Sequence, residues 1–157
     1  MTFFLLNILL ALAWTALTGQ YSVENFFLGF IFGYLVLWVT QQGRTTPSYF
    51  RKVPRVILFL LFFLWELVVA SLRVVYDILT PAHRMSPGII ALPLEAKTDV
   101  EITFLANLIT LTPGTLSVEV SADRSVLFVH AMYIDDVEKV KRHLKNGFER
   151  RLLEIFR

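Results

Sequence analysis

The sequence predicts a membrane α-helical N-terminal half of two to three helices, followed by a small α+β C-terminal domain of the order β-α-β-β-α. Two observations predict this division. The first forty residues contain no lysine or arginine and only one carboxylate, Glu24, which suits a bilayer rather than water. Residues 81–157 instead carry ten basic and ten acidic side chains in amphipathic patterns. We therefore place membrane helices in residues 1–80 and the α+β domain in residues 81–157.

The composition supports a membrane protein and excludes several classes. Hydrophobic residues make up 55% of the 157 residues and charged residues 18%, whereas a soluble domain carries about 25% charged residues. The chain has no cysteine, which excludes disulfides, zinc–thiolate sites and iron–sulfur clusters. Its net charge is only +2, and no basic cluster is interleaved with aromatic residues, so we expect no nucleic-acid partner.

The first two predicted helices span residues 3–18 and 23–40, on either side of a short polar turn. Each is slightly shorter than the roughly 20 residues that a bilayer requires. Gly29 and Gly33 lie four residues apart on the second helix, a spacing that lets another helix approach closely. The alternative is that these are two of the glycines common in apolar helices, with no packing role.

Residues 41–55 form a polar linker whose charges indicate its side of the membrane. It contains four basic residues and no acidic one. Because positive residues favour the cytoplasmic side, we expect this linker and the N-terminus in the cytoplasm.

The third predicted helix spans residues 55–80 and ends before Pro81. Glu66, Arg73 and Asp77 fall within about 40° of one another on it, so they form one polar stripe. The helix either lies along the membrane with this stripe in water, or presents the stripe to other membrane helices, where its charges need partners. Ion conduction through the stripe is the least favoured interpretation.

The number of spans decides on which side the C-terminal domain lies. Three full spans would put the domain outside the cell, unless the N-terminus is itself outside. A third helix that lies along the membrane keeps the domain inside.

The C-terminal elements follow from local signals. A first strand is predicted at residues 88–92, and a capping box of Thr98 and Glu101 opens a helix at 99–111. Alternation predicts a half-buried strand at 116–120, and the more apolar segment 126–133 is the expected central strand.

Asp135 and Asp136 open a long final helix with one apolar stripe, which packs against the sheet. The strand–helix–strand connection predicts that the first two strands run parallel, and the hairpin adds an antiparallel strand.

No set of residues has the pattern of an active site. His83, His130 and His143 lie in a connector, a strand and a helix, without the spacing of a metal site, so a structural role is the expected one for each. The chain has no Gly-x-Ser-x-Gly nucleophile elbow and no glycine-rich phosphate loop. We therefore expect no catalytic residue, no bound metal and no cofactor, and a protein that is not an enzyme.

The most particular segment is the end of the 99–111 helix and the turn after it. Threonine hydroxyls can bond the carbonyls left open at a helix end, and Pro113-Gly114 reverses the chain with a positive φ at the glycine. Asn107 lies in the middle of an apolar helix, where it needs a hydrogen-bonding partner. The residues of interest in this segment are Asn107, Thr110, Thr112, Pro113, Gly114 and Thr115.

This segment, Leu105–Leu116, resembles the signature of the E subunits of the Mrp-type multi-subunit Na⁺/H⁺ antiporters, also called Mnh or Pha. Residues 87–93 and 129–132 resemble the same family. The resemblance implies an accessory, structural subunit in a bacterial cell membrane, which supports assembly and full activity of proton-driven Na⁺ efflux. Its implied partners are the lipid bilayer, the large complex-I-like subunits, which carry the ion chemistry, and the small membrane subunits. It also implies a cytoplasmic C-terminal domain.

A different class remains open from the sequence. The chain could be a free-standing membrane-anchored module whose α+β domain binds a ligand or a soluble protein. Purification in mild detergent separates the two, because a member of a complex elutes with several apolar partners and a free-standing module elutes alone.

Overall fold

The computed structural model describes residues 2–40, 48–80 and 85–157 and divides by contacts into two compact units, Met1–Pro54 and Arg55–Arg157. Most of the third helix therefore belongs with the C-terminal unit. The predicted boundary at residue 80 separates a membrane half from an aqueous half, and it stays a prediction. Arg44 of the basic linker and Pro81 and His83 of the connector lie outside the described residues.

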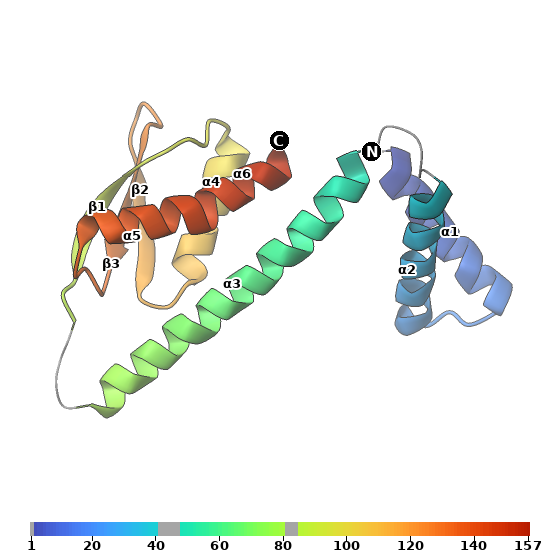
Figure 1. The fold of residues 1–157 in the computed structure, drawn as a ribbon, viewed down its shortest axis with the longest axis horizontal. Coiled ribbons are helices and arrows are strands. Elements are labelled where there is room, and N and C mark those ends of the chain that lie inside the picture. The colour runs from blue at the N-terminus through green and yellow to red at the C-terminus, as the bar shows by residue number, and fades with distance from the viewer. Residues whose placement is uncertain (1, 41–47, 81–84) are drawn as a thin grey trace. The chain divides into compact units, whose positions relative to one another are not determined.

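The first unit contains a helical hairpin of α1 (Thr2–Thr18) and α2 (Val23–Thr40), which pack against each other (Figure 1). Each helix buries a narrow stripe of small and polar residues and exposes large apolar side chains elsewhere. Asn25 ties the turn together, because its Oδ1 accepts from Trp14 Nε1 at 3.0 Å and its Nδ2 donates to Thr18 Oγ1 at 2.7 Å. Such an inverted pattern, polar inside and apolar outside, suits a lipid environment. α2 is long and apolar enough to cross a membrane, and α1 is a shorter apolar helix.

α3 (Ser48–Leu79) begins seven residues before the predicted start at residue 55 and contains Pro54. The sequence does not indicate this early start because proline normally disfavours the helix before it. Packing explains the difference: Phe50, only 5% exposed, and Tyr49 stack their rings on each other and on Tyr34. Burial of these aromatics in the first unit offsets the hydrogen bond that Pro54 does not make.

The C-terminal unit contains a three-stranded antiparallel sheet of the order β1-β3-β2 (Figure 1). The strands are β1 (Gly88–Pro93), β2 (Thr115–Val120) and β3 (Val126–Ala131). β3 is central, as the sequence predicts. β1 and β2 run in the same direction, as expected for the crossover, but β3 separates them, so every pairing is antiparallel.

Helices cover one face of this sheet. α4 (Asp99–Leu111) and the C-terminal helices share a core with β1 and β3, and the capping box of Thr98 and Glu101 opens α4 as predicted. The opposite face of the sheet is partly exposed, with Ile89 at 64% and Leu116 at 49%. The core residues are Leu92, Leu105, Ile109, Leu127, Val129, Leu144, Phe148 and Leu152. The predicted fold class, membrane helices plus a small α+β region, is confirmed.

The final helix is interrupted, which the sequence does not predict. α5 (Val137–His143) leads into a π-helical turn, η1 (Leu144–Glu149), before α6 (Arg150–Phe156). The wider turn places Phe148 and Glu149 in the interior, each about 1% exposed. It also brings Gly147 against α3, where a β-carbon would lie 3.1 Å from Phe62 Cζ. A π-turn of this kind is often found at functional positions.

Candidate functional site

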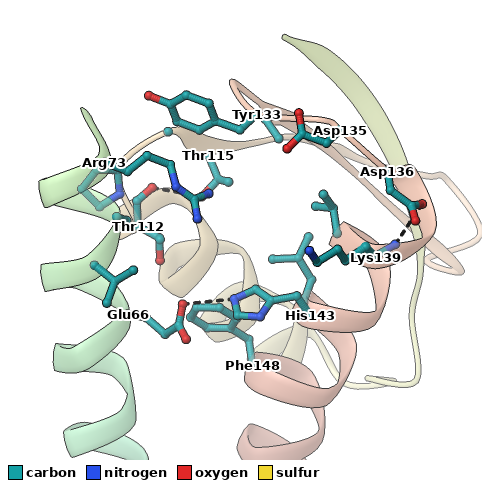
Figure 2. Close-up of a pocket in the computed structure, with 17 residues that line it drawn as sticks. Glu66, Arg73, Thr112, Thr115, Tyr133, Asp135, Asp136, Lys139, His143 and Phe148 are labelled. Atoms are coloured by element: carbon teal, nitrogen blue, oxygen red, sulfur yellow. Dashed lines mark hydrogen bonds and ion pairs between the residues drawn. The ribbon is translucent and has the colours of Figure 1, made fainter. Parts of the chain in front are cut away.

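The polar stripe of α3 faces the C-terminal sheet and helices. Figure 2 shows Glu66 and Arg73 pointing from α3 into a pocket whose other wall comes from α5 and the ends of the strands. The partner of the stripe is therefore the chain's own C-terminal region. Neither sequence interpretation, water or other membrane helices, named that partner.

Glu66 and His143 form the polar contact at the centre of this surface. Glu66 Oε2 lies 3.1 Å from His143 Nε2, across 77 residues of chain (Figure 2). The Glu66 side chain is 19% exposed, and the His143 ring also meets Phe148 edge-on at 6.0 Å. Of the three histidines, only His143 is thus placed beside a carboxylate in the described part of the chain; His130 lies on β3.

Arg73 and Asp77 both reach Tyr133, just after β3. The Arg73 guanidinium lies 5.5 Å from the centre of the Tyr133 ring, a cation–π contact. Asp77 is 8% exposed. The pKa of the Tyr133 hydroxyl is raised, first by hydrogen bonding to Asp77, then by the burial of Tyr133 itself and by the negative charge of Asp77. Both the Tyr133 hydroxyl and Asp77 Oδ2 are buried, and neither makes a hydrogen bond to any other group in the described part of the chain. All three members of the stripe are engaged within the C-terminal unit.

The pocket between α3 and this surface has a volume of about 440 Å³. Its lining carries charges of both signs, among them Asp135, Asp136 and Lys139 as well as Glu66 and Arg73. In the described ranges, no three His, Asp or Glu side chains are arranged to hold a metal ion. Some of these charges have partners: the Asp136 side chain, for example, accepts from the backbone N–H groups of Glu138 and Lys139 at the start of α5.

The threonine-rich segment after α4 closes the end of that helix. Thr112 Oγ1 donates to the carbonyl of Leu108 at 3.0 Å, and Thr115 Oγ1 donates to that of Ile109 at 2.6 Å. Thr110 Oγ1 accepts from the Ser117 backbone at 3.1 Å, which fastens α4 to β2. These are side-chain bonds of the kind that the sequence predicts for a helix end.

Pro113 and Gly114 complete the turn and form part of the pocket wall. Gly114 has φ +89°, the positive value that the Pro-Gly pair predicts. Tyr133 packs on the same spot, since a β-carbon on Gly114 would lie 3.3 Å from its Cε2. The turn therefore helps to place the ring that Arg73 and Asp77 contact.

Asn107 has a different environment from the one that its neighbours indicate. It is exposed on α4, on the same face as Phe104 (53% exposed) and Leu111 (60%). Because it is exposed, it needs no buried partner. The prediction that Asn107 needs a partner was wrong because some of the apolar residues around it, such as Phe104 and Leu111, have exposed side chains.

Gly29 and Gly33 face α1 of the same hairpin. A β-carbon at Gly29 would lie 2.9 Å from Trp14 Cβ, and one at Gly33 would meet the side-chain oxygen of Asn7. The close approach across these glycines thus occurs inside the chain.

Sequence reasoning also missed Glu149. The Glu149 side chain is 2% exposed and enters the core, where its Oε1 accepts from the backbone N–H groups of Glu95 (2.5 Å) and Ala96 (3.0 Å). Lys145 Nζ lies 3.8 Å from its other oxygen. The sequence gives one hint of this burial, which is that Glu149 directly follows Phe148 of the apolar stripe. With regular α-helical spacing, however, Glu149 is expected to lie outside that stripe.

The chain is similar to known proteins over almost its whole length, and the family model and the individual relatives agree. The family described as MNHE, Na⁺/H⁺ ion antiporter subunit, matches residues 7–155. The Na⁺/H⁺ antiporter E subunit of Bacillus subtilis is 39% identical over 153 residues, covering 98% of this chain and 97% of the relative. The E subunit of Alkalihalophilus pseudofirmus is 35% identical over 151 residues, covering 96% of each.

Two solved structures are also similar. A chain of the Mrp complex from Dietzia sp. DQ12-45-1b has 33% identity and a TM-score of 0.51, and the match covers 66% of this chain and 96% of that one. A chain of the membrane-bound sulfane sulfur reductase, an archaeal respiratory membrane complex, has 29% identity and a TM-score of 0.60, with 98% of each covered.

Proposed function

The chain belongs to the family of Na⁺/H⁺ antiporter E subunits, and from this premise we propose that it is a structural subunit of a multi-subunit sodium/proton antiporter. The observation that carries the proposal is similarity to named E subunits over 96–98% of the chain. Its partners are the other subunits of the same complex, large and small, and it resides in a bacterial membrane.

The contacts of the ionisable residues support a structural role rather than a place on the ion path. A proton carrier in a membrane must change its protonation state and reach a connected series of such groups. Here Glu66, Arg73 and Asp77 each contact a side chain of the chain's own C-terminal region. α1 and α2 together hold one ionisable carboxylate, Glu24, at the first turn of α2. We therefore propose that the chain is not an enzyme and does not carry ions itself.

Glu66→Gln is the variant that tests this role. The amide can still bond His143, so we expect a loss of about 1 kcal/mol of local stability and transport within about fivefold of the parent. The measurement is Na⁺-dependent proton movement in everted membrane vesicles, with the amount of assembled complex determined in parallel. Glu154→Gln, at an exposed carboxylate, is the control and should change neither quantity. An assembled Glu66→Gln complex without transport would place this chain on the ion path and overturn the structural role.

We further propose that the C-terminal region faces the cytoplasm. Arg51, Lys52 and Arg55 lie at the start of α3, and positive residues favour the cytoplasmic side. Arg55 Nη1 donates to the Glu154 carbonyl at 3.0 Å, so α6 lies on the same side as this end of α3.

A single cysteine at Ala122, in the exposed turn between β2 and β3, tests the orientation. The chain has no natural cysteine, so labelling reports that position alone. In intact cells we expect Ala122→Cys to resist a membrane-impermeant thiol reagent and to react after permeabilisation. Ser22→Cys, in the turn of the hairpin, is the matched control and should react without permeabilisation. Labelling of Ala122→Cys from outside in intact cells would contradict the proposed side.

A further inference from the structure

α3 has two faces of opposite chemistry from Ile57 to Leu79. Twelve large apolar side chains on it are 49–78% exposed. At about 100° per residue they fall within an arc of about 160°, which contains no charged residue. Representative members are Leu58, Leu61, Trp65, Val68, Leu72 and Leu79.

The opposite face of α3 packs against the C-terminal region along its length. The contacts begin at Arg55, which donates to the Glu154 carbonyl, and continue at Phe62, whose ring lies 5.5 Å from that of Phe148. They end at Asp77, beside Tyr133. From Arg55 to Asp77 the helix rises about 33 Å, which is close to the roughly 30 Å thickness of a bilayer's hydrocarbon core.

This arrangement is incompatible with α3 as a membrane span. If α3 crossed the bilayer, the attached region would lie at the depth of the acyl chains. That region has a sheet with two open edges and charged side chains such as Arg150 and Glu154, at 72% and 50% exposure. Open sheet edges and exposed charges are not stable in hydrocarbon. By length and hydropathy alone α3 is a candidate span, but its contacts with the C-terminal region contradict that assignment.

We propose that α3 lies in the membrane–water interface, with its apolar face in the acyl chains of one leaflet and the C-terminal region on its aqueous side. The occupant of the apolar face is lipid. Arg51, Lys52 and Arg55 at its start complement anionic headgroups, and Trp65 and Tyr76, 67% and 55% exposed, are residue types that favour the interface. This assignment rests on the contacts of α3 and does not depend on which ion the complex moves.

Depth measurements along α3 test the proposal in the assembled complex. Single cysteines replace Leu58, Val68 and Leu79, carry an environment-sensitive fluorophore, and are reconstituted into phosphatidylethanolamine/phosphatidylglycerol vesicles. Lipids carrying a quencher near the headgroup or near the end of the acyl chain then report depth. We expect the shallow quencher to be the stronger one at all three positions, with similar ratios.

α2 supplies the matched control, because it is the candidate span of the hairpin. Cysteines at Val23, Ile31 and Val39, which are 56–69% exposed, should give the deep quencher its strongest effect at Ile31. The same profile on α3, deepest at Val68 and shallow at both ends, would overturn the proposal in favour of a span. No quenching at any α3 position would overturn it in favour of coverage by another protein of the complex. Either result leaves the transport test of Glu66→Gln unaffected, so the two proposals fail separately.

Discussion

Gly29→Leu is expected to separate α1 from α2 and to prevent accumulation of the assembled complex. A β-carbon at Gly29 would lie 2.8–2.9 Å from Trp14 Cδ1, Cβ and Cγ, closer than carbon atoms approach. The indole has little room to move, because its Nε1 donates to Asn25. Overpacking of this kind costs about 1–3 kcal/mol for small additions, and leucine adds four carbons.

The measurement is the amount of complex recovered from membranes and its thermal midpoint in detergent. Gly29→Ala should give an intermediate loss, since it adds only the β-carbon. Leu28→Ala is the control: Leu28 is 45% exposed on the same helix, and its truncation should change stability by less than about 0.5 kcal/mol. Normal recovery of Gly29→Leu would mean that the two helices pack less closely than their geometry indicates.

Glu149→Ala is expected to destabilise the C-terminal region more than removal of any exposed carboxylate. The substitution leaves the backbone N–H groups of Glu95 and Ala96 without their acceptor, and leaving a buried donor such as the Ala96 N–H unsatisfied costs about 1–3 kcal/mol. We expect a total loss of about 2–5 kcal/mol. Glu149→Gln keeps one acceptor oxygen and should lie between the alanine variant and the parent.

Unfolding can be followed through a buried thiol in the full chain. Val129→Cys is fully buried on β3, so it reacts with a thiol reagent only when the core opens. The urea concentration that exposes this thiol should fall strongly for Glu149→Ala. Glu154→Ala, whose carboxylate is 50% exposed and pairs with Arg150, should leave it nearly unchanged. Equal midpoints for the two variants would show that Glu149 is not a structural acceptor.

Most of the helices and strands could be predicted from short sequence patterns, because the interactions that start and end these elements are local. The capping box at Thr98 and Glu101 fixes the start of α4, and the apolar content of β3 marks it as the central strand. The start of α3 could not be predicted in this way, because Pro54 disfavours a helix there and only the packing of Phe50 reverses that preference. The π-turn was equally hidden, since one extra residue in a turn does not interrupt the apolar stripe.

For the candidate site, the sequence predicts that three residues share a helix face, but it does not predict what they contact. The spacing of Glu66, Arg73 and Asp77 places them on one face of a helix, which follows from helical geometry. Which surface meets that face depends on pairs far apart in sequence, such as Glu66 with His143. No periodicity encodes such pairs. Asn107 illustrates the converse, because an apolar neighbourhood in sequence is not always a buried one in space.

The two faces of α3 also set a problem of timing during synthesis. The ribosome completes α3 before it makes the sheet and helices that cover Phe62 and Glu66. At about 5–20 residues per second, translation of residues 81–157 takes roughly 4–15 s. For that interval a nascent helix with a long apolar stretch faces the insertion machinery without its polar cover. We expect Glu66, Arg73 and Asp77 to oppose its lateral release into the bilayer as a further span, because charged side chains are costly in hydrocarbon. The stripe would then act during biogenesis, before it makes its contacts in the folded protein.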